Sequence, residues 1–302
     1  MNMKTTSERK PVSLEGGFSL LELVFVVAIL TAVLASVFGW VSLVIQRSQA
    51  EQTKVDLTQE GREFVDEFER DLHQAGYPNC RMVATAGVAS NCPADYTVNP
   101  TVASNSSVAA GVVYLSNTKL IFEGDVNGDG IVETVQYRLV DSAGNYPPTT
   151  SCPCTIQRSE MVKVNGTMPL AQPTTFSQEL QNVVNSGVPA GNPPPAYGGG
   201  LPISGNTAWG ATNSAFYAAL TTFKDFPVFQ AYDQNGFLIA LPQDITTTAG
   251  VQVLTCSVAN VNCLKSIRLT IDLLANSTTG TDLQTKTRPV TTMVGTARLV
   301  NN

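Results

Sequence analysis

Gly16-Gly17-Phe18-Ser19-Leu20-Leu21-Glu22-Leu23 opens the apolar run that decides the fold. From Phe18 to Ile45 the chain carries one charged residue, Glu22. At about 1.5 Å per residue, a helix over this run is roughly 42 Å long, which is enough to cross the hydrocarbon core of a bilayer. The run therefore predicts a single membrane-spanning helix near the N-terminus.

The segment ahead of the run, residues 1–17, is polar and carries Lys4, Arg9 and Lys10. Basic residues on this side predict a cytoplasmic N-terminus and an exported C-terminal body. A cleaved secretory signal peptide fits poorly, because the run is too long and no small-x-small site closes it. A plain signal anchor explains everything except Glu22, whose carboxylate costs about 2.5–3.5 kcal/mol at mid-bilayer and less near the end of the span. Such a residue predicts a function and a cationic partner.

These residues resemble the class III signal of type IV prepilins and type II secretion pseudopilins. In that family a prepilin peptidase cuts after the glycine and methylates the new amine. The resemblance implies that Gly17 precedes the cut, that Phe18 becomes the N-methylated first mature residue, and that Glu22 becomes the fifth, the hallmark glutamate. The new ammonium on Phe18 and the Glu22 carboxylate of a neighbouring subunit would pair in a filament core, which offsets much of the cost of two lone charges.

Beyond Arg47 the chain is highly charged as far as Asp71, yet apolar residues keep a helical spacing. They predict an amphipathic helix over 46–76 whose apolar stripe packs on a sheet. Val65 widens the stripe, and Gly61 weakens the helix locally by about 1 kcal/mol relative to alanine. The residues of this stripe are Leu57, Phe64, Phe68 and Leu72. A coiled-coil partner is disfavoured, because the repeat covers too few heptads.

The end of this helix, Phe68-Glu69-Arg70-Asp71-Leu72-His73-Gln74-Ala75-Gly76-Tyr77, is similar to the R-D-L-x-x-A-G-Y stretch of PilW-like minor pilins. Gly76 is a predicted helix stop, and Pro78 prevents continuation. His73 is then a helix-end residue rather than a catalytic one.

The remainder, 77–302, is rich in Thr, Ser, Asn, Gly, Pro and Val, which suits strands and turns. Alternating apolar residues predict an antiparallel sheet against the helix. A long loop-rich insertion is expected at about 141–215, with a short helix around Phe176–Val184. The predicted strands are Val112–Leu115, Lys119–Glu123, Thr134–Val140, Val228–Tyr232, Phe237–Ala240, Val251–Cys256, the stretch from Ile267 to Leu273, and Thr291–Val300.

One segment, residues 125–133, matches the first half of a calcium loop, with oxygen-bearing side chains at alternate positions followed by glycine. Gln136 stands where such loops place their bidentate acid. A hairpin turn that binds no ion is the competing interpretation. If calcium binds, the predicted ligands are Asp125, Asn127, Asp129, Glu133 and the Ile131 carbonyl.

An even number of cysteines in an exported chain favours disulfides: Cys80, Cys92, Cys152, Cys154, Cys256 and Cys263. Local closure favours Cys80–Cys92 and Cys256–Cys263, whereas Cys152–Cys154 spans one residue and would be strained. A metal site such as zinc is the weaker alternative. The spacing of Cys152 and Cys154 does not suit a zinc knuckle, and the one histidine, His73, is far away in the sequence.

Several function classes are disfavoured by composition. A net charge of -6 and the lack of a basic patch argue against nucleic-acid binding. With one histidine, a Ser/His/Asp triad or a histidine-based metal site is not expected, and no phosphate-binding or dinucleotide motif is present. A non-enzymatic role is therefore predicted.

The expected architecture is α+β, in which a long N-terminal membrane-spanning helix packs on an antiparallel head, as in the type IV pilin fold that the resemblance implies. Residues 1–17 form the leader, 18–45 the transmembrane and 46–76 the amphipathic half of the helix, and 77–302 the periplasmic or extracellular head. The implied location is the inner membrane before assembly and the pilus afterwards. The expected partners are membrane lipid, prepilin peptidase, the inner-membrane assembly platform and other pilin subunits.

The function that follows is that of a minor pilin, which helps initiate a type IV pilus or forms part of its tip and so supports adhesion, twitching motility or DNA uptake. A J-class minor pseudopilin of a type II secretion system is one alternative. A membrane-anchored, calcium-dependent adhesin that never polymerises is another.

Overall fold

The computed structural model describes residues 19–80, 82, 104–141, 143–148, 153–185, 227–255, 263–275 and 290–300. The chain divides into two compact units, Met1–Ser48 and Gln49–Asn302. One helix, α1 (Leu20–His73), contributes to both units.

The first unit consists, where it is described, of the apolar part of α1. Its side chains are exposed throughout, and the most apolar 18-residue window has a mean hydropathy of 2.7 with none of its residues buried. By length and composition this helix is able to cross a membrane, and no other described helix is. The coarse expectation of an apolar N-terminal helix is thereby confirmed.

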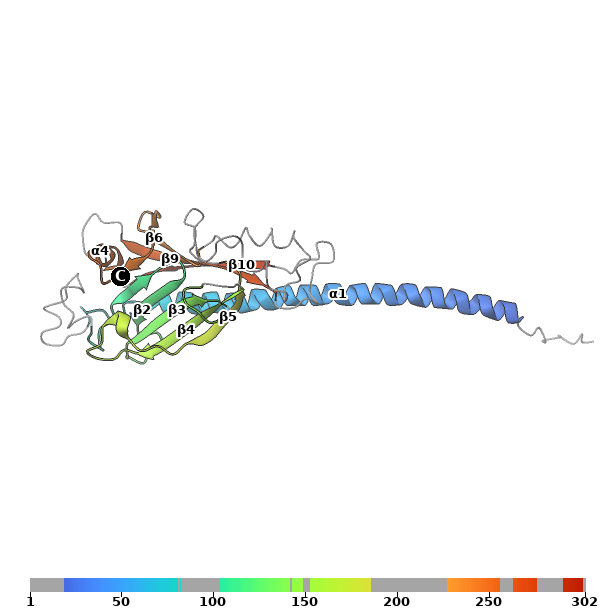
Figure 1. Ribbon diagram of the computed structural model, residues 1–302, viewed down its shortest axis with the longest axis horizontal. Helices are drawn as coiled ribbons and strands as arrows, with labels where there is room; N and C mark the ends of the chain where they lie inside the picture. The colour runs from blue at the N-terminus through green and yellow to red at the C-terminus, as the bar shows by residue number, and fades with distance from the viewer. Residues whose placement is uncertain are drawn as a thin grey trace, which may run out of the picture. The chain divides into compact units, whose positions relative to one another are not determined.

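The second unit is built on an antiparallel sheet in the order β7-β6-β9-β5-β4-β3-β2-β1-β8, with β10 pairing with β9. Figure 1 labels β2 to β6, β9 and β10 of this sheet. A short 3-10 helix, η2 (Pro169–Ala171), and the helix α4 (Thr248–Thr255) complete the described elements. The strands are β1 (Gly111–Leu115), β2 (Lys119–Gly124), β3 (Glu133–Val140), β4 (Cys154–Val162), β5 (Ser177–Val183), β6 (Phe229–Asp233), β7 (Leu238–Ile239), β8 (Gln243–Asp244), β9 (Leu264–Leu274) and β10 (Val290–Arg298).

The core of this unit lies between the sheet and the C-terminal part of α1. The predicted stripe of α1 is buried, with Leu57 and Phe64 6% and 4% exposed and Phe68 and Leu72 fully buried. The Phe64 and Phe68 rings meet the Tyr137 ring edge-on at centroid distances of 5.9 and 5.6 Å. The α+β class and the packing of the stripe are therefore confirmed.

Gly61, which lies within the stripe, has a packing role that its low helix propensity does not suggest. A Cβ at Gly61 would lie 2.8 Å from Cγ of Met293 and 3.0 Å from Cδ1 of Leu273. Because real Cβ atoms do not approach other atoms so closely, Gly61 lets β9 and β10 come near the helix. The loss of helix propensity is thus offset by packing.

The end of α1 is held against strand β2. Gly76 has a positive φ of 79°, and its N–H donates to the Glu123 carbonyl at 2.8 Å. Ala75 forms an isolated bridge with Gly124, where an added Cβ would collide with the Gln74 carbonyl oxygen. The predicted stop near Gly76 is confirmed, with His73 as the last helical residue.

Two predicted elements are wrong in type. The helix expected at Phe176–Val184 is strand β5, because burial of Leu180 and Val183 in the sheet overrides the helix-forming residues between them. The strand expected at Val251–Cys256 is helix α4, as far as the described residues reach.

Helix α4 is favoured by a cap that the valine-rich pattern obscures. The Thr247 hydroxyl accepts the Gly250 N–H at 3.0 Å, and its carbonyl accepts the Val251 N–H at 2.9 Å. Such a cap satisfies N–H groups that a helix start leaves unpaired. Val251 and Leu254 are then buried three residues apart on one face.

The insertion predicted at about 141–215 is also wrong in part. Strands β4 and β5 lie inside it and pair with each other and with β3 and β9. They form the centre of the sheet rather than a mobile loop. The stretch from 186 to 226 lies outside the described residues.

Candidate functional site

The predicted processing and assembly site lies at the start of α1. Gly17 and Phe18 fall outside the described residues, so their position relative to Glu22 stays a prediction. Glu22 lies in the first helical turn, where its N–H donates to the Ser19 carbonyl at 2.9 Å.

The surroundings of Glu22 are apolar. Its neighbours Leu20, Leu21 and Leu23 are all exposed, and the next charged residue of α1 is Arg47. Within the described part of the chain, no hydrogen bond or ion pair reaches the Glu22 carboxylate. A carboxylate that enters lipid or a packed helical core in this state is costly unless a cation from elsewhere meets it.

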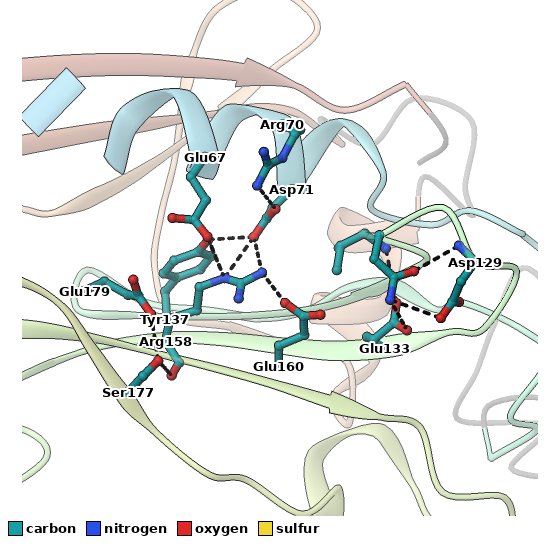
Figure 2. A network of polar contacts seen from close by, with 12 residues as sticks. Glu67, Arg70, Asp71, Asp129, Glu133, Tyr137, Arg158, Glu160, Ser177 and Glu179 are labelled. Carbon is teal, nitrogen blue, oxygen red and sulfur yellow. Dashed lines mark hydrogen bonds and ion pairs between the residues drawn. The ribbon is translucent and has the colours of Figure 1, made fainter. Parts of the chain in front are cut away.

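A second cluster, which the sequence did not reveal as a site, joins α1 to the sheet (Figure 2). The carboxylate of Asp71, 1% exposed, accepts bonds at its Oδ2 from the Tyr137 hydroxyl at 2.7 Å and from Arg158 Nη2 and Nε at 2.8 and 3.0 Å. Arg158 also contacts Glu160 at 2.6 Å and Glu67 at 3.6 Å. We call these five residues the polar clamp.

The electrostatics of the polar clamp hold Tyr137 and Arg158 in their proton-donating forms. Burial, and next the Asp71 carboxylate, raise the pKa of the Tyr137 hydroxyl well above its usual value, so that the hydroxyl stays a donor. Burial alone would lower the pKa of Arg158, but Tyr137 and Asp71 outweigh it and raise the pKa. The polar clamp is consequently a charged link between helix and sheet, and burial raises the pKa of its Glu67 carboxyl.

A buried ion pair anchors the segment that enters β1. Lys163 Nζ lies 2.6 Å from Glu123 Oε2, and both side chains are fully buried. Lys163 also donates to the Val108 carbonyl at 2.8 Å, and the Ala110 N–H donates to Glu123 Oε2 at 2.9 Å. Since each charge has a partner, the pair holds residues 108–110 against the sheet.

The predicted calcium loop is brought together as a compact turn between β2 and β3. The Asp125 carboxylate accepts the N–H groups of Gly128, Asp129 and Gly130 at 2.7, 3.1 and 2.9 Å. Asp129 likewise accepts the Ile131 N–H at 2.8 Å. These bonds are those of a turn stabilised by its own side chains.

The remaining predicted ligands lie in the same turn. Asn127 accepts the Asp129 N–H at 2.9 Å, and Glu133 accepts the Val126 N–H at 3.2 Å. Among the described residues no group of three or more His, Cys, Asp or Glu side chains is arranged to hold a metal ion. Calcium binding and an ion-free turn stay the two interpretations of this segment.

The Glu133 carboxyl of the turn has a raised pKa. Burial is the largest cause, and the charges of Asp129, Asp125 and Glu160 add to it, so that the pKa of Glu133 is raised from 4.5 to about 7. The folded state therefore binds this proton more tightly than the unfolded chain does. The resulting stabilisation is present below pH 4.5 and is lost as the pH rises through about 7.

We expect the denaturant midpoint of the wild-type chain to fall between pH 5 and pH 8 by more than that of Glu133→Gln, which cannot titrate. In Asp129→Asn the fall should move to lower pH, because one of the charges that raise the Glu133 pKa is removed. Identical pH profiles for all three proteins would contradict the assignment. Repeating the pH 8 measurement with calcium separates the two interpretations, since an ion that binds only the folded state raises the midpoint.

The cysteines are oxidised wherever they are described. Cys80, Cys154 and Cys263 are each disulfide-bonded. The other three, Cys92, Cys152 and Cys256, lie outside the described residues, and the pairing stays a prediction. Disulfides agree with the expectation of an exported head.

Comparison with known proteins adds no further assignment. No family model, curated protein or solved structure matches this chain.

Proposed function

We propose that this chain is a subunit of a filament of the type IV pilin class, anchored in a membrane by α1 until it is polymerised. The observation that carries the proposal is Glu22, one carboxylate in the first turn of a largely apolar helix that has no other charged residue as far as Ile45. The glycine and phenylalanine that precede it complete the resemblance to a prepilin signal. A sheet packed on the C-terminal part of the same helix is the arrangement that the resemblance implies.

Within that class we propose a minor pilin similar to the PilW family, which initiates a type IV pilus or contributes to its tip. The R-D-L-x-x-A-G-Y ending of the helix supports this assignment, as does the size of the head, because a bulky head packs poorly at every position of a dense filament. Its partners are then prepilin peptidase, the inner-membrane assembly platform and other pilin subunits.

Glu22 has a defined task in this proposal. Cleavage after Gly17 creates an ammonium on Phe18, and the carboxylate of a neighbouring subunit meets it in the apolar filament core. Neither charge is stable there alone, so only subunits at the correct axial offset satisfy both. The pair sets the register between subunits more than it adds net stability.

The direct test is the N-terminus of the exported protein. In cells with a working prepilin peptidase, we expect the purified chain to begin at Phe18 and to carry one added methyl group on its amine, as read by peptide mass spectrometry. Gly17→Leu should keep residues 1–17, whereas the matched substitution Gly16→Leu should be cut. A wild-type protein that retains its first 17 residues in such cells overturns the proposal.

A further inference from the structure

Strand β10 is a long open edge of the described sheet. It pairs with β9 along its nine residues, and no described strand pairs with its other side. The two ends of the strand order, β7 and β8, are only two residues long. Native proteins usually shorten, charge or cover a sheet edge, because its unpaired backbone groups accept another strand.

The register shows which groups of β10 point outward. Val294 lies opposite Thr270, whose N–H is already bonded to the Val228 carbonyl on the far side of β9 at 2.9 Å. In an antiparallel pair such residues direct their N–H and C=O groups away from each other. Val294 therefore points its backbone groups to the outside, as do Thr292 and Thr296 at the same spacing.

The outer edge of β10 runs along α1. The outward N–H of Thr296 donates to Glu69 Oε1 at 2.8 Å, and a Cβ at Gly295 would lie 2.6 Å from Cγ1 of Val65. Glu69 thus covers one position of the edge. Among the described residues, no hydrogen bond reaches the backbone groups of Val294. This residue is 47% exposed.

Among the described residues, those that line a hollow of about 500 Å³ all belong to α1. Arg62 and Asp66, which line it, precede Glu69 by seven and three residues and so share its side of the helix. The hollow therefore lies on the side of α1 that carries Glu69, and it carries charges of both signs. The described residues that line it are Lys54, Val55, Thr58, Gln59, Arg62, Glu63 and Asp66.

We propose that an extended segment of a neighbouring subunit of the same filament adds to the outer edge of β10. This inference rests on the proposed function, because the filament is what brings a neighbouring subunit to this edge. The open edge lies beside Val65 and Glu69 of α1. A single side chain such as Glu69 covers one of these positions, whereas an extended backbone satisfies outward N–H and C=O groups at every second residue. The charged hollow on α1 receives the side chains of the same segment.

The test uses a proline that blocks the edge without disturbing the ladder to β9. At Val294 the missing N–H is the outward one, so Val294→Pro keeps the bonds between β9 and β10. We expect this variant to be incorporated into sheared filaments about tenfold less than wild type, as the loss of one or two backbone hydrogen bonds predicts. The matched variant Val294→Ala keeps the N–H and should be incorporated nearly as well as wild type. Equal incorporation of all three proteins overturns the inference, as does an equal loss in both variants.

A second measurement uses the wild-type chain and does not depend on how the proline variant folds. Hydrogen exchange should be fast at the amides of Thr292 and Val294 in the detergent-solubilised subunit and strongly slowed in filaments, whereas the amides of Thr291 and Met293 should be protected in both. Unchanged exchange at Val294 on incorporation overturns the inference. Wild-type protein that is never incorporated at all contradicts the proposed function instead.

Discussion

Replacing Glu22 by alanine is expected to abolish incorporation into filaments while export, membrane insertion and removal of residues 1–17 continue. The variant keeps Gly17 and Phe18, so the peptidase still finds its substrate. What it loses is the one carboxylate of the apolar segment, and with it the partner of the new ammonium on the neighbouring subunit.

The expected effect is large because the surviving charge is left alone. Removing one member of a buried ion pair costs about 3–5 kcal/mol, since the other charge stays desolvated. By the usual conversion of about 1.4 kcal/mol per tenfold, each subunit contact weakens by a factor of about 10²–10⁴. The measurement is the amount of this subunit in sheared, purified filaments relative to the amount in the membrane.

The controls separate charge from shape. Glu22→Gln keeps the size of the side chain and should fail as completely as the alanine variant. Ser36→Ala changes another exposed polar residue of the same apolar segment and should assemble normally. A chain that supports surface adhesion equally well with and without Glu22 would instead favour the anchored adhesin that never polymerises.

The helical half of the molecule was predictable because its signal is periodic and long. Leu57, Phe64, Phe68 and Leu72 repeat at helical spacing, and all four are buried as expected. Such a stripe specifies an element and its inward face without knowledge of the partner surface. Most outer strands of the sheet followed in the same way from alternation.

The predictions failed where the partner surface decides the element. The segment of β5, Ser-Gln-Glu-Leu-Gln-Asn-Val, holds helix-forming residues, and only its position between β4 and β9 makes it a strand. Helix α4 shows the converse, because the Thr247 cap and three-residue burial outweigh β-branched residues. Propensity is a weak prior that tertiary contacts override.

The polar clamp was missed for a related reason. Asp71 and Arg158 are 87 residues apart, and a single sequence contains no sign of their contact. One signal was nevertheless present. Asp71 follows Phe64 by seven residues and Phe68 by three, which places it on the inward-facing side of α1, and a carboxylate so placed needs a buried partner.

Arg158→Ala is expected to destabilise the head by about 3–5 kcal/mol, because Asp71 then keeps a buried charge from which its main cation has been removed. That is a large part of the roughly 5–15 kcal/mol that stabilise a typical domain. Arg158→Lys should recover only part of the loss, since an ammonium cannot reproduce the contacts of Nη2 and Nε together. The measurement is denaturant unfolding of the detergent-solubilised chain with its disulfides intact.

The double variant Asp71→Ala with Arg158→Ala decides whether the loss comes from the pair itself. Removing both charges leaves neither buried alone, so we expect the double variant to be more stable than the sum of the single variants predicts, by roughly 0.5–3 kcal/mol. Strict additivity would mean that Arg158 acts through packing of its apolar stem instead. Because the prepilin-like signal lies far upstream in the sequence, all of these variants should still lose residues 1–17, which separates the stability of the head from processing.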